Sequence, residues 1–225
     1  MFIVSAIQPY FVPYLPYFAM LAASDRVVIL DDVQFPRRGR VHRNSLADDL
    51  GRPGWLTLPL TKCAVDTRIA QLRFHPCAER LMQAQLQRFP VTRTPPAQVR
   101  FLTDSLCDFS LPPQAYILQK LDAICAMLGL PFRYQLASQL PCDGIDYQSR
   151  IIRYVKAVGG DLYLNPSAGQ ALYQASAFTD AGLGLRFLPD YQGPKWSMLQ
   201  RLATESVPAL IGETRAIIDA CRNGE

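Results

Sequence analysis

Hydrophobic positions along the chain form short apolar runs that alternate with longer amphipathic stretches. Residues 2–6 (FIVSA) and 26–30 (RVVIL) are apolar runs typical of buried strands. Prolines interrupt the segment that follows the first run, but Pro16 suits the first turn of a helix, so we predict a helix over residues 17–23. Strand, helix and strand in this order predict a parallel pair of strands joined by a right-handed crossover.

The same alternation continues through the rest of the chain. We predict helices where apolar residues recur at helical spacing, at residues 76–89, 111–128, 147–159, 168–181, 195–204 and 208–221. Apolar or alternating runs predict strands at residues 54–60, 132–140, 161–165 and 183–189. This order of elements is typical of a single three-layer α/β domain with a mostly parallel, Rossmann-like sheet that spans residues 1–225.

Three local features qualify that picture. Residues 61–110 break the alternation, and we expect an inserted lid or subdomain there. Residues 36–46 (PRRGRVHRNSL) are expected to form a basic loop. Either Asp143 or Asp146 is expected to cap the helix that begins at Tyr147.

Composition sets the class of protein. With 225 residues, 49% of them apolar and 19% charged, the chain can form a substantial hydrophobic core. A net charge of +4 is compatible with a phosphate-bearing ligand but does not by itself indicate nucleic acid.

Cysteine usage and the N-terminal residues bear on metals and location. Six scattered cysteines without a C-x-x-C pair, and only two histidines, argue against a zinc site and are typical of buried free thiols in a reducing compartment. The N-terminal residues lack the basic region of a signal peptide, and no apolar run approaches the ~18 residues of a membrane span. We therefore expect a cytoplasmic protein, and the sequence names no cofactor.

Aromatic and amide side chains follow the first predicted strand. Gln8, Tyr10 and Tyr14 lie in a proline-rich segment that would lose little entropy on binding a ligand. Their rings offer flat faces for stacking and hydroxyls for hydrogen bonds, although the same rings could serve as core anchors under a loop. Because ligands of open α/β sheets bind at the carboxyl ends of strands, we interpret these three residues as substrate-binding.

Two adjacent carboxylates follow the second predicted strand at the same edge of the sheet. Asp31 and Asp32 would point to opposite faces if the strand continued. One of them could act as a general base or hold a metal or a hydroxyl while the other caps a loop, and both could equally be turn carboxylates. Gln34 continues this polar edge, so all three are candidate catalytic residues.

A basic run comes directly after this edge. Arginine presents a planar fork that matches phosphate, so Arg40 and Arg43 are candidate phosphate ligands, although such runs are often merely solvated. Asn44 could orient an acceptor as a neutral hydrogen-bonding group.

Two later segments also follow predicted strands. Ser167 and Gly169 lie where a helix would begin, which is either an anion site or a plain helix cap. Tyr191 and Lys195 follow the last strand and could reach the same edge. The sequence contains no P-loop, G-x-G-x-x-G, G-x-S-x-G or H-E-x-x-H motif.

Two N-terminal blocks and a tryptophan run resemble the WbqC-like family. The blocks are IQPYFVPYLPYF (7–18) and DRVVILDDVQF (25–35), followed by an arginine–asparagine pair at 43–44 and WLTLP (55–59). Members of that family usually carry His-Gln-Pro-x-Tyr-x-Pro-x-x-Gly-Tyr-Phe, then Asp-x-x-Val-x-Leu-Asp-Asp-Val-Gln-Phe and Trp-Leu-Thr-x-Pro. Residues 163–191 are similar to a later strand–glycine–helix block of the family, and the resemblance thins between residues 61 and 140.

The chain departs from the family pattern at specific positions. Ile7 replaces the leading histidine, Pro16 replaces a glycine, and Gln200 stands where an aspartate is usual. If that histidine is catalytic in relatives, the departure implies an altered activity or a different substrate here. The opening strand, loop and helix also resemble the nucleotidyltransferase superfamily that includes pantothenate synthetases, but the two loop histidines of those enzymes are absent.

The resemblance implies a bacterial cytoplasmic protein of surface-polysaccharide or related biosynthesis. Together with the candidate residues, it supports the hypothesis of a transferase that moves an acyl- or aminoacyl-type group onto a nucleotide sugar or another phosphate-bearing small molecule. The alternatives are a non-catalytic binding or scaffold protein of a biosynthetic complex and an enzyme that takes its donor from charged tRNA, which the basic loop permits but the modest net charge does not demand.

Overall fold

The computed structural model describes residues 1–141 and 146–223. Its main sheet has five parallel strands in the order β5-β2-β1-β6-β7 among these residues. The strands are β1 (Ile3–Ile7), β2 (Arg26–Ile29), β5 (Tyr134–Leu136), β6 (Leu162–Asn165) and β7 (Gly184–Phe187). The predicted parallel pair is confirmed, because Val4 of β1 pairs with Arg26 of β2 and the register continues to Ile7 and Ile29.

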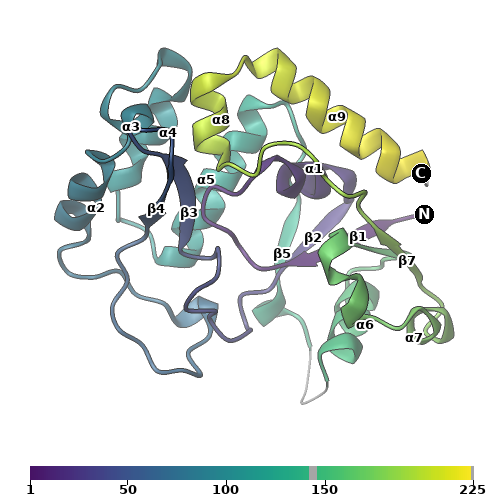
Figure 1. Cartoon of the computed structure of the whole chain (residues 1–225). Helices are drawn as coiled ribbons and strands as arrows, with labels where there is room; N and C mark the ends of the chain where they lie inside the picture. The colour runs from purple at the N-terminus through teal and green to yellow at the C-terminus, as the bar shows by residue number, and fades with distance from the viewer. Residues whose placement is uncertain (142–145, 224–225) are drawn as a thin grey trace.

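Helices cover both faces of this sheet, which confirms the three-layer α/β architecture. The helices are α1 (Leu15–Ala23), α2 (Ala78–Leu86), α3 (Pro90–Arg93), α4 (Arg100–Asp104), α5 (Pro113–Met127), α6 (Tyr147–Ala157), α7 (Ala175–Asp180), α8 (Met198–Thr204) and α9 (Val207–Asn223). Figure 1 shows α1 and α9 above the sheet and α6 and α7 below it.

The alternation of side chains along β1 explains the two cores. Ile3 and Ile7 belong to the larger core, which also contains residues of α1, α5 and the C-terminal helices. Val4 and Ala6 point to the other face and pack in the smaller core with residues of α6 and α7. Because β1 is buried on both faces, its sequence is a continuous apolar run rather than an alternating one.

The basic segment is only partly a loop, which corrects our expectation for residues 36–46. Its last residues form β3 (Arg43–Ala47), which pairs antiparallel with β4 (Pro53–Thr57) in a separate hairpin. The Asp48 carboxylate accepts hydrogen bonds from the Leu50 and Arg52 amides, and Gly51 adopts φ +73° at the turn. The turn residues therefore favour a hairpin, and the neighbouring arginines made its first strand hard to recognise from the sequence.

Residues 61–110 are less regular, as expected. They contain α2, α3 and α4 with 3-10 turns at Ile69–Gln71, Ala97–Val99 and Ser105–Cys107. This region packs beside the hairpin and α8 at the left of Figure 1. Whether it acts as a lid remains a prediction.

Several element boundaries differ from the prediction. The helix expected over residues 168–181 is instead a 3-10 segment (Ser167–Leu172) followed by the shorter α7. The strand expected over residues 132–140 ends at Leu136 and continues as a 3-10 turn (Ala137–Gln139). Asp146 caps α6 by accepting a hydrogen bond from the Ser149 amide at 3.1 Å, whereas Asp143 lies outside the described residues.

The described cysteines are unpaired. Cys125 and Cys221 are buried, Cys63 and Cys107 are half-buried, and Cys77 is exposed, so only some of them match the expected buried thiols. Cys142 lies outside the described residues. In the described part of the chain, no helix is long and apolar enough to cross a bilayer.

Candidate functional site

A large cleft lies where the strand order of the main sheet reverses. From β1 the chain extends the sheet through β2 and β5 on one side, and β6 and β7 complete it on the other. Residues that follow β1, β6 and β7 line a cleft of about 940 Å³. A crevice at the carboxyl ends of parallel strands, at such a reversal, is the usual ligand site of open α/β sheets.

The proline-rich segment after β1 forms one wall, and buried hydrogen bonds hold its conformation. Val12 adopts φ +37°, which is unfavourable for a β-branched residue. Its carbonyl accepts hydrogen bonds from Asn44 Nδ2 at 2.9 Å and from Ser197 Oγ at 2.7 Å. At the start of the segment, the Tyr17 hydroxyl donates to the Gln8 carbonyl at 2.8 Å. The segment is therefore preformed by contacts from two distant parts of the chain, at Asn44 and Ser197, and from Tyr17 in the helix that follows it.

Aromatic rings face one another along this wall. The Tyr10 ring stacks on Tyr17 with centroids 5.4 Å apart, and the Tyr14 ring lies 6.4 Å from that of Tyr191 on the opposite side. Burial raises the pKa of the Tyr10 phenol, which the nearby Arg40 charge partly offsets. The Tyr10 phenol therefore stays neutral at physiological pH and can stack and hydrogen-bond.

The cleft floor comes from the end of β6. Asn165 is 7% exposed, and its Oδ1 accepts a hydrogen bond from the Tyr163 hydroxyl at 3.1 Å. A methyl group at Gly169 would lie 2.0 Å from Asn165 Nδ2, so this glycine makes room for the amide. The Tyr163 hydroxyl is also 3.0 Å from that of Tyr173, which in turn donates to Tyr147 at 3.3 Å.

Sequence reasoning overlooked two of these residues. Asn165 ends a predicted strand at the ligand edge, so the rule that selected Gln8 could have found it. Tyr147 also lines the cleft but belongs to the first turn of α6. It lies ten residues or more beyond β5, so it was not read as a residue of the strand end, although a helix that follows a parallel strand begins at the same edge of the sheet.

Ser167 and Gly169 do lie at the cleft, but not at the start of a long helix. The segment that they begin is a six-residue 3-10 turn, and no side chain caps it. The aligned peptide dipoles that would favour an anion there are correspondingly few. At Gly169, the absence of a side chain lets the backbone lie close to the Asn165 amide.

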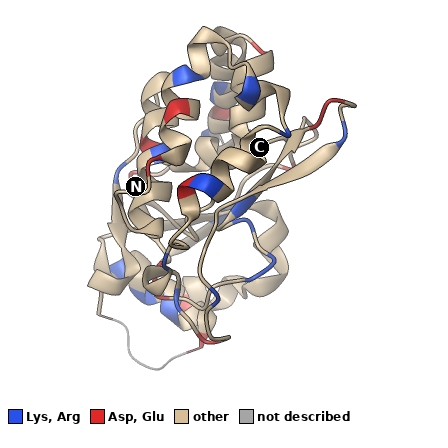
Figure 2. Ribbon diagram, turned by 90° about the vertical axis from the view of Figure 1, so that its left-hand side faces the viewer, with Lys and Arg blue, Asp and Glu red and all other residues tan. Residues whose placement is uncertain are grey.

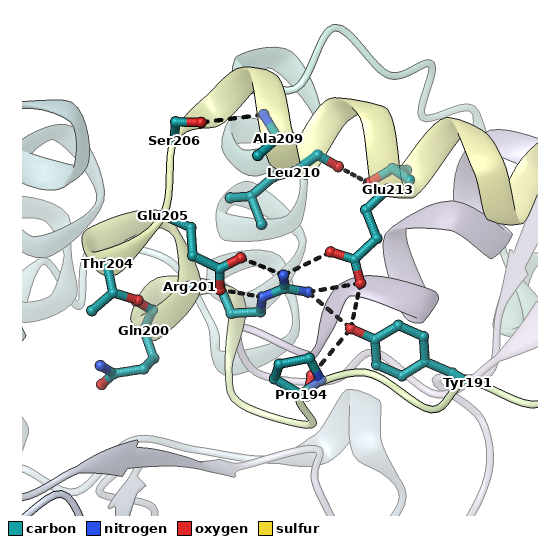
Figure 3. Close-up of polar contacts among 11 residues, drawn as sticks. Tyr191, Pro194, Gln200, Arg201, Thr204, Glu205, Ser206, Ala209, Leu210 and Glu213 are labelled. Atoms are coloured by element: carbon teal, nitrogen blue, oxygen red, sulfur yellow. Dashed lines mark hydrogen bonds and ion pairs between the residues drawn. The ribbon is translucent and has the colours of Figure 1, made fainter.

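Tyr191 and Lys195 lie on the segment that closes the third side of the cleft. The Tyr191 hydroxyl donates to Glu213 Oε1 at 2.7 Å and accepts from Arg201 at 2.9 Å, as Figure 3 shows. Burial raises the pKa of the Tyr191 phenol, and its bond to Glu213 adds to the shift. Among the described lining residues, Lys195 and Asp190 carry the formal charges.

The structure does not bring the predicted catalytic carboxylates to the cleft lining. Asp31 is 1% exposed, and its oxygens accept hydrogen bonds from the amide and hydroxyl of Ser138 and from Gln114. Asp32 accepts from the Tyr154 hydroxyl at 2.5 Å, and its second oxygen is buried without a hydrogen-bond partner among the described residues. The Gln34 amide donates to the Val65 carbonyl at 2.6 Å. Asp31 thus joins β2 to the turn after β5, and a catalytic role for any of the three stays a prediction.

The basic run lies beside the proline-rich wall rather than in the cleft. Arg40 donates to Asn44 Oδ1 at 2.8 Å, and Arg43 donates to the Arg38 carbonyl at 2.6 Å. The Arg43 guanidinium lies 4.4 Å from the ring centre of the half-exposed Trp55. Asn44 is fully buried, so its amide holds the backbone of the wall instead of facing the cleft.

Charge and metal-ligand patterns limit the chemistry. Basic and acidic segments are interspersed along the ribbon in Figure 2. Burial and the Arg43 charge lower the pKa of His42 to about 4, so this histidine is neutral at physiological pH. Among the described residues, no group of three or more His, Cys, Asp or Glu side chains is placed to hold a metal ion.

Comparison with known proteins gives one match. The model of the WbqC-like protein family matches residues 8–202. No curated protein and no solved structure matches the chain.

Proposed function

The chain belongs to the WbqC-like protein family, and on that premise we propose that its cleft binds a nucleotide sugar or a related phosphate-bearing sugar and that the protein transfers an acyl- or aminoacyl-type group to it. The observation that carries this proposal is the composition of the cleft. It combines tyrosine rings with uncharged amides at the reversal point of a parallel sheet, and a single lysine lies at its edge.

Each part of such a ligand has a chemical counterpart in the cleft. Tyr10 and Tyr14 offer faces on which a base or sugar ring can stack. The amides of Gln8 and Asn165 suit hydroxyl groups, because each amide can donate and accept. Lys195 provides a positive charge for phosphate. The cleft volume of about 940 Å³ lies at the upper end of the range for small-molecule sites.

The proposed reaction needs an acceptor, a base and a leaving group. A sugar hydroxyl or amine attacks the carbonyl carbon of the acyl donor, a new ester or amide bond forms, and the bond to the donor's leaving group breaks. The proton of the acceptor passes to a base. We assign this role to Asp32, because its second oxygen lacks a hydrogen-bond partner among the described residues, whereas the Asp31 oxygens are engaged. Neither residue lines the cleft, so this assignment requires the Asp32 oxygen to come within reach of a bound acceptor during transfer.

One observation favours a second function, binding without catalysis. Among the described residues that line the cleft, Asp190 is the only carboxylate, and histidine and cysteine are absent. A scaffold protein would bind the sugar and a partner enzyme without turnover. Transfer from charged tRNA has less support, because a net charge of +4 is modest for a chain that binds nucleic acid.

A thermal-shift panel of nucleotide sugars, nucleoside triphosphates and acyl donors tests the binding part. At a ligand excess of ~100 Kd, binding adds about 2.7 kcal/mol to the free energy of unfolding. For a chain of this size that corresponds to a rise in Tm of about 5–11 °C. We expect the rise with nucleotide sugars, a smaller rise in Lys195→Ala, and a wild-type rise in Lys156→Ala, whose exposed lysine lies on α6 away from the cleft.

Turnover tests the catalytic part. With the ligand class known, Asp32→Asn should bind the sugar normally and lose transfer. Binding by the wild-type protein without transfer from any acyl donor would favour the scaffold function. A tRNA-dependent enzyme would instead bind charged tRNA with an affinity that falls steeply as salt concentration rises.

A further inference from the structure

A buried arginine lies behind one wall of the cleft. Arg201, on α8, is 3% exposed. Its Nε and one terminal nitrogen donate to the two oxygens of Glu205 at 2.6 and 2.5 Å. The terminal nitrogens also reach both oxygens of Glu213, on α9, at 2.7 and 3.3 Å. Figure 3 shows the guanidinium between the two carboxylates.

The fifth contact of this guanidinium is the Tyr191 hydroxyl, at 2.9 Å. An arginine side chain has five N–H donors, and these contacts account for all of them. The Tyr191 hydroxyl in turn donates to Glu213, so the phenol completes the network. The Arg201 hydrogen bonds lower the pKa of the Glu213 carboxyl, which stays ionised at neutral pH.

The network matters because the segment that carries Tyr191 has few other attachments. The Leu188 amide donates to the Asn165 carbonyl at one end, and the Met198 amide donates to the Pro13 carbonyl at the other. Within the described chain, no backbone hydrogen bond joins residues 189–196 to another element. Tyr191 is therefore the main polar anchor of this stretch.

The local sequence is built around that phenol. A methyl group at Gly193 would lie 2.3 Å from the Tyr191 hydroxyl oxygen, so the segment folds over the ring only with glycine there. The Pro194 carbonyl lies 3.3 Å from the same hydroxyl. Tyr191 also lines the cleft, where its ring centre lies 6.4 Å from that of Tyr14.

We infer that Arg201 is a positioning residue for the cleft: through Tyr191 it fixes residues 189–196, and with them Lys195, in the place from which they contact a ligand. The inference rests on the proposed function only in taking the cleft as the ligand site. A segment fixed in advance loses less entropy on binding, so Arg201, which does not line the cleft, contributes to affinity without touching the ligand.

The first test needs no ligand. Trp196 is the last residue of the segment and becomes the sole tryptophan when Trp55 is replaced by phenylalanine. In that background, Tyr191→Phe removes the hydroxyl and keeps the ring. We expect roughly tenfold faster amide exchange in residues 189–196 and stronger acrylamide quenching of Trp196. The exchange of α8 and α9 should stay unchanged.

A matched control is Tyr173→Phe, which deletes a hydroxyl on the other side of the cleft. It should leave the exchange of residues 189–196 and the Trp196 signal unchanged. A purely structural role of Tyr191 would lower the melting temperature and accelerate exchange throughout α8 and α9. That outcome, or unchanged exchange in Tyr191→Phe, would overturn the inference.

The second test uses a nucleotide sugar. Tyr191→Phe should weaken its binding roughly tenfold, and Glu213→Gln should weaken it in the same direction because Arg201 loses a charged partner. If Tyr191→Phe showed faster amide exchange but bound the nucleotide sugar with unchanged affinity, the positioning role would be contradicted and the proposed function would not. Absence of any nucleotide-sugar binding by the wild-type protein would contradict the proposed function, while the exchange experiment would still decide whether Arg201 positions the segment.

Discussion

Replacing Asn44 with alanine should destabilise the protein and distort the proline-rich wall of the cleft. The Asn44 amide donates to the carbonyls of Phe11 and Val12 at 3.2 and 2.9 Å, and its oxygen accepts from Arg40 and the Ser45 amide at 2.8 and 2.9 Å. All four contacts disappear in Asn44→Ala. The side chain is fully buried, so water does not replace them without rearrangement.

The magnitude follows from which groups are left without partners. The Val12 carbonyl keeps the Ser197 hydroxyl, whereas the Phe11 carbonyl loses its side-chain donor. Two to three groups then lack a partner, at about 1–3 kcal/mol each when buried; since Arg40 and Ser45 are half-buried, we take the lower part of this range and expect a loss of roughly 3 kcal/mol. For a chain of this length, the melting temperature should fall by about 6–12 °C.

The assay is thermal and urea unfolding of Asn44→Ala beside Gln83→Ala. Gln83 is an exposed amide on α2, and its loss should change the free energy of unfolding by less than about 0.5 kcal/mol. If Asn44→Ala melted like the wild-type protein but failed to bind a nucleotide sugar, Asn44 would contact the ligand directly. That result would refute the structural role of Asn44 and support the role expected from the sequence, in which its amide orients an acceptor.

Three further predictions concern the cleft, the network behind it and the core. Gly169→Ala should weaken the binding of a nucleotide sugar roughly tenfold in calorimetry, because the added methyl would displace the Asn165 amide. Unchanged binding would show that this amide does not contact the ligand. Arg201 lowers the pKa of Glu213 in the folded protein below its usual 4.5, so the stability it contributes is present above pH 4.5 and is lost as the pH falls through the lowered value. The melting temperature of Glu213→Gln should therefore fall less steeply than that of the wild-type protein between about pH 5.5 and pH 3, and parallel curves would contradict this. Burial lowers the pKa of Lys120, which is 1% exposed, so Lys120→Met should leave the melting temperature unchanged or raise it, whereas a fall of more than about 5 °C would show that the charge is stabilising.

The parallel sheet could be predicted from sequence because its strands are short apolar runs separated by helical periodicity. The carboxyl ends of those strands also located the cleft, through Gln8 and Tyr14. The β3 strand was missed because a run of arginines leads into it, although only Arg43 of its own five residues is charged. Its burial alternates, with Leu46 pointing inward between half-buried neighbours, but the preceding arginines dominate the local pattern.

The roles of individual polar residues could not be predicted, because their partners are distant in sequence. Asp31 meets Ser138, which is 107 positions away, and the Val12 carbonyl meets Ser197, which is 185 positions away. A local pattern identifies a polar residue at a strand end, but it does not identify the donor that will form a hydrogen bond with it. The partners of Arg201 are nearer in sequence, 10 positions away for Tyr191 and 12 for Glu213. They lie on different elements, so its role depends on how α8 packs against α9 and against the segment that carries Tyr191.

The central claim is that the cleft beside β1, β6 and β7 binds a phosphate-bearing sugar. Titration of the isotope-labelled protein with a nucleotide sugar, followed by amide chemical shifts, tests it most directly. The account predicts saturable shifts in residues 8–14, 165–170 and 188–195, with little change in the β3–β4 hairpin. Shifts confined to the hairpin and the basic run, or no saturable shift with any nucleotide sugar, would contradict it.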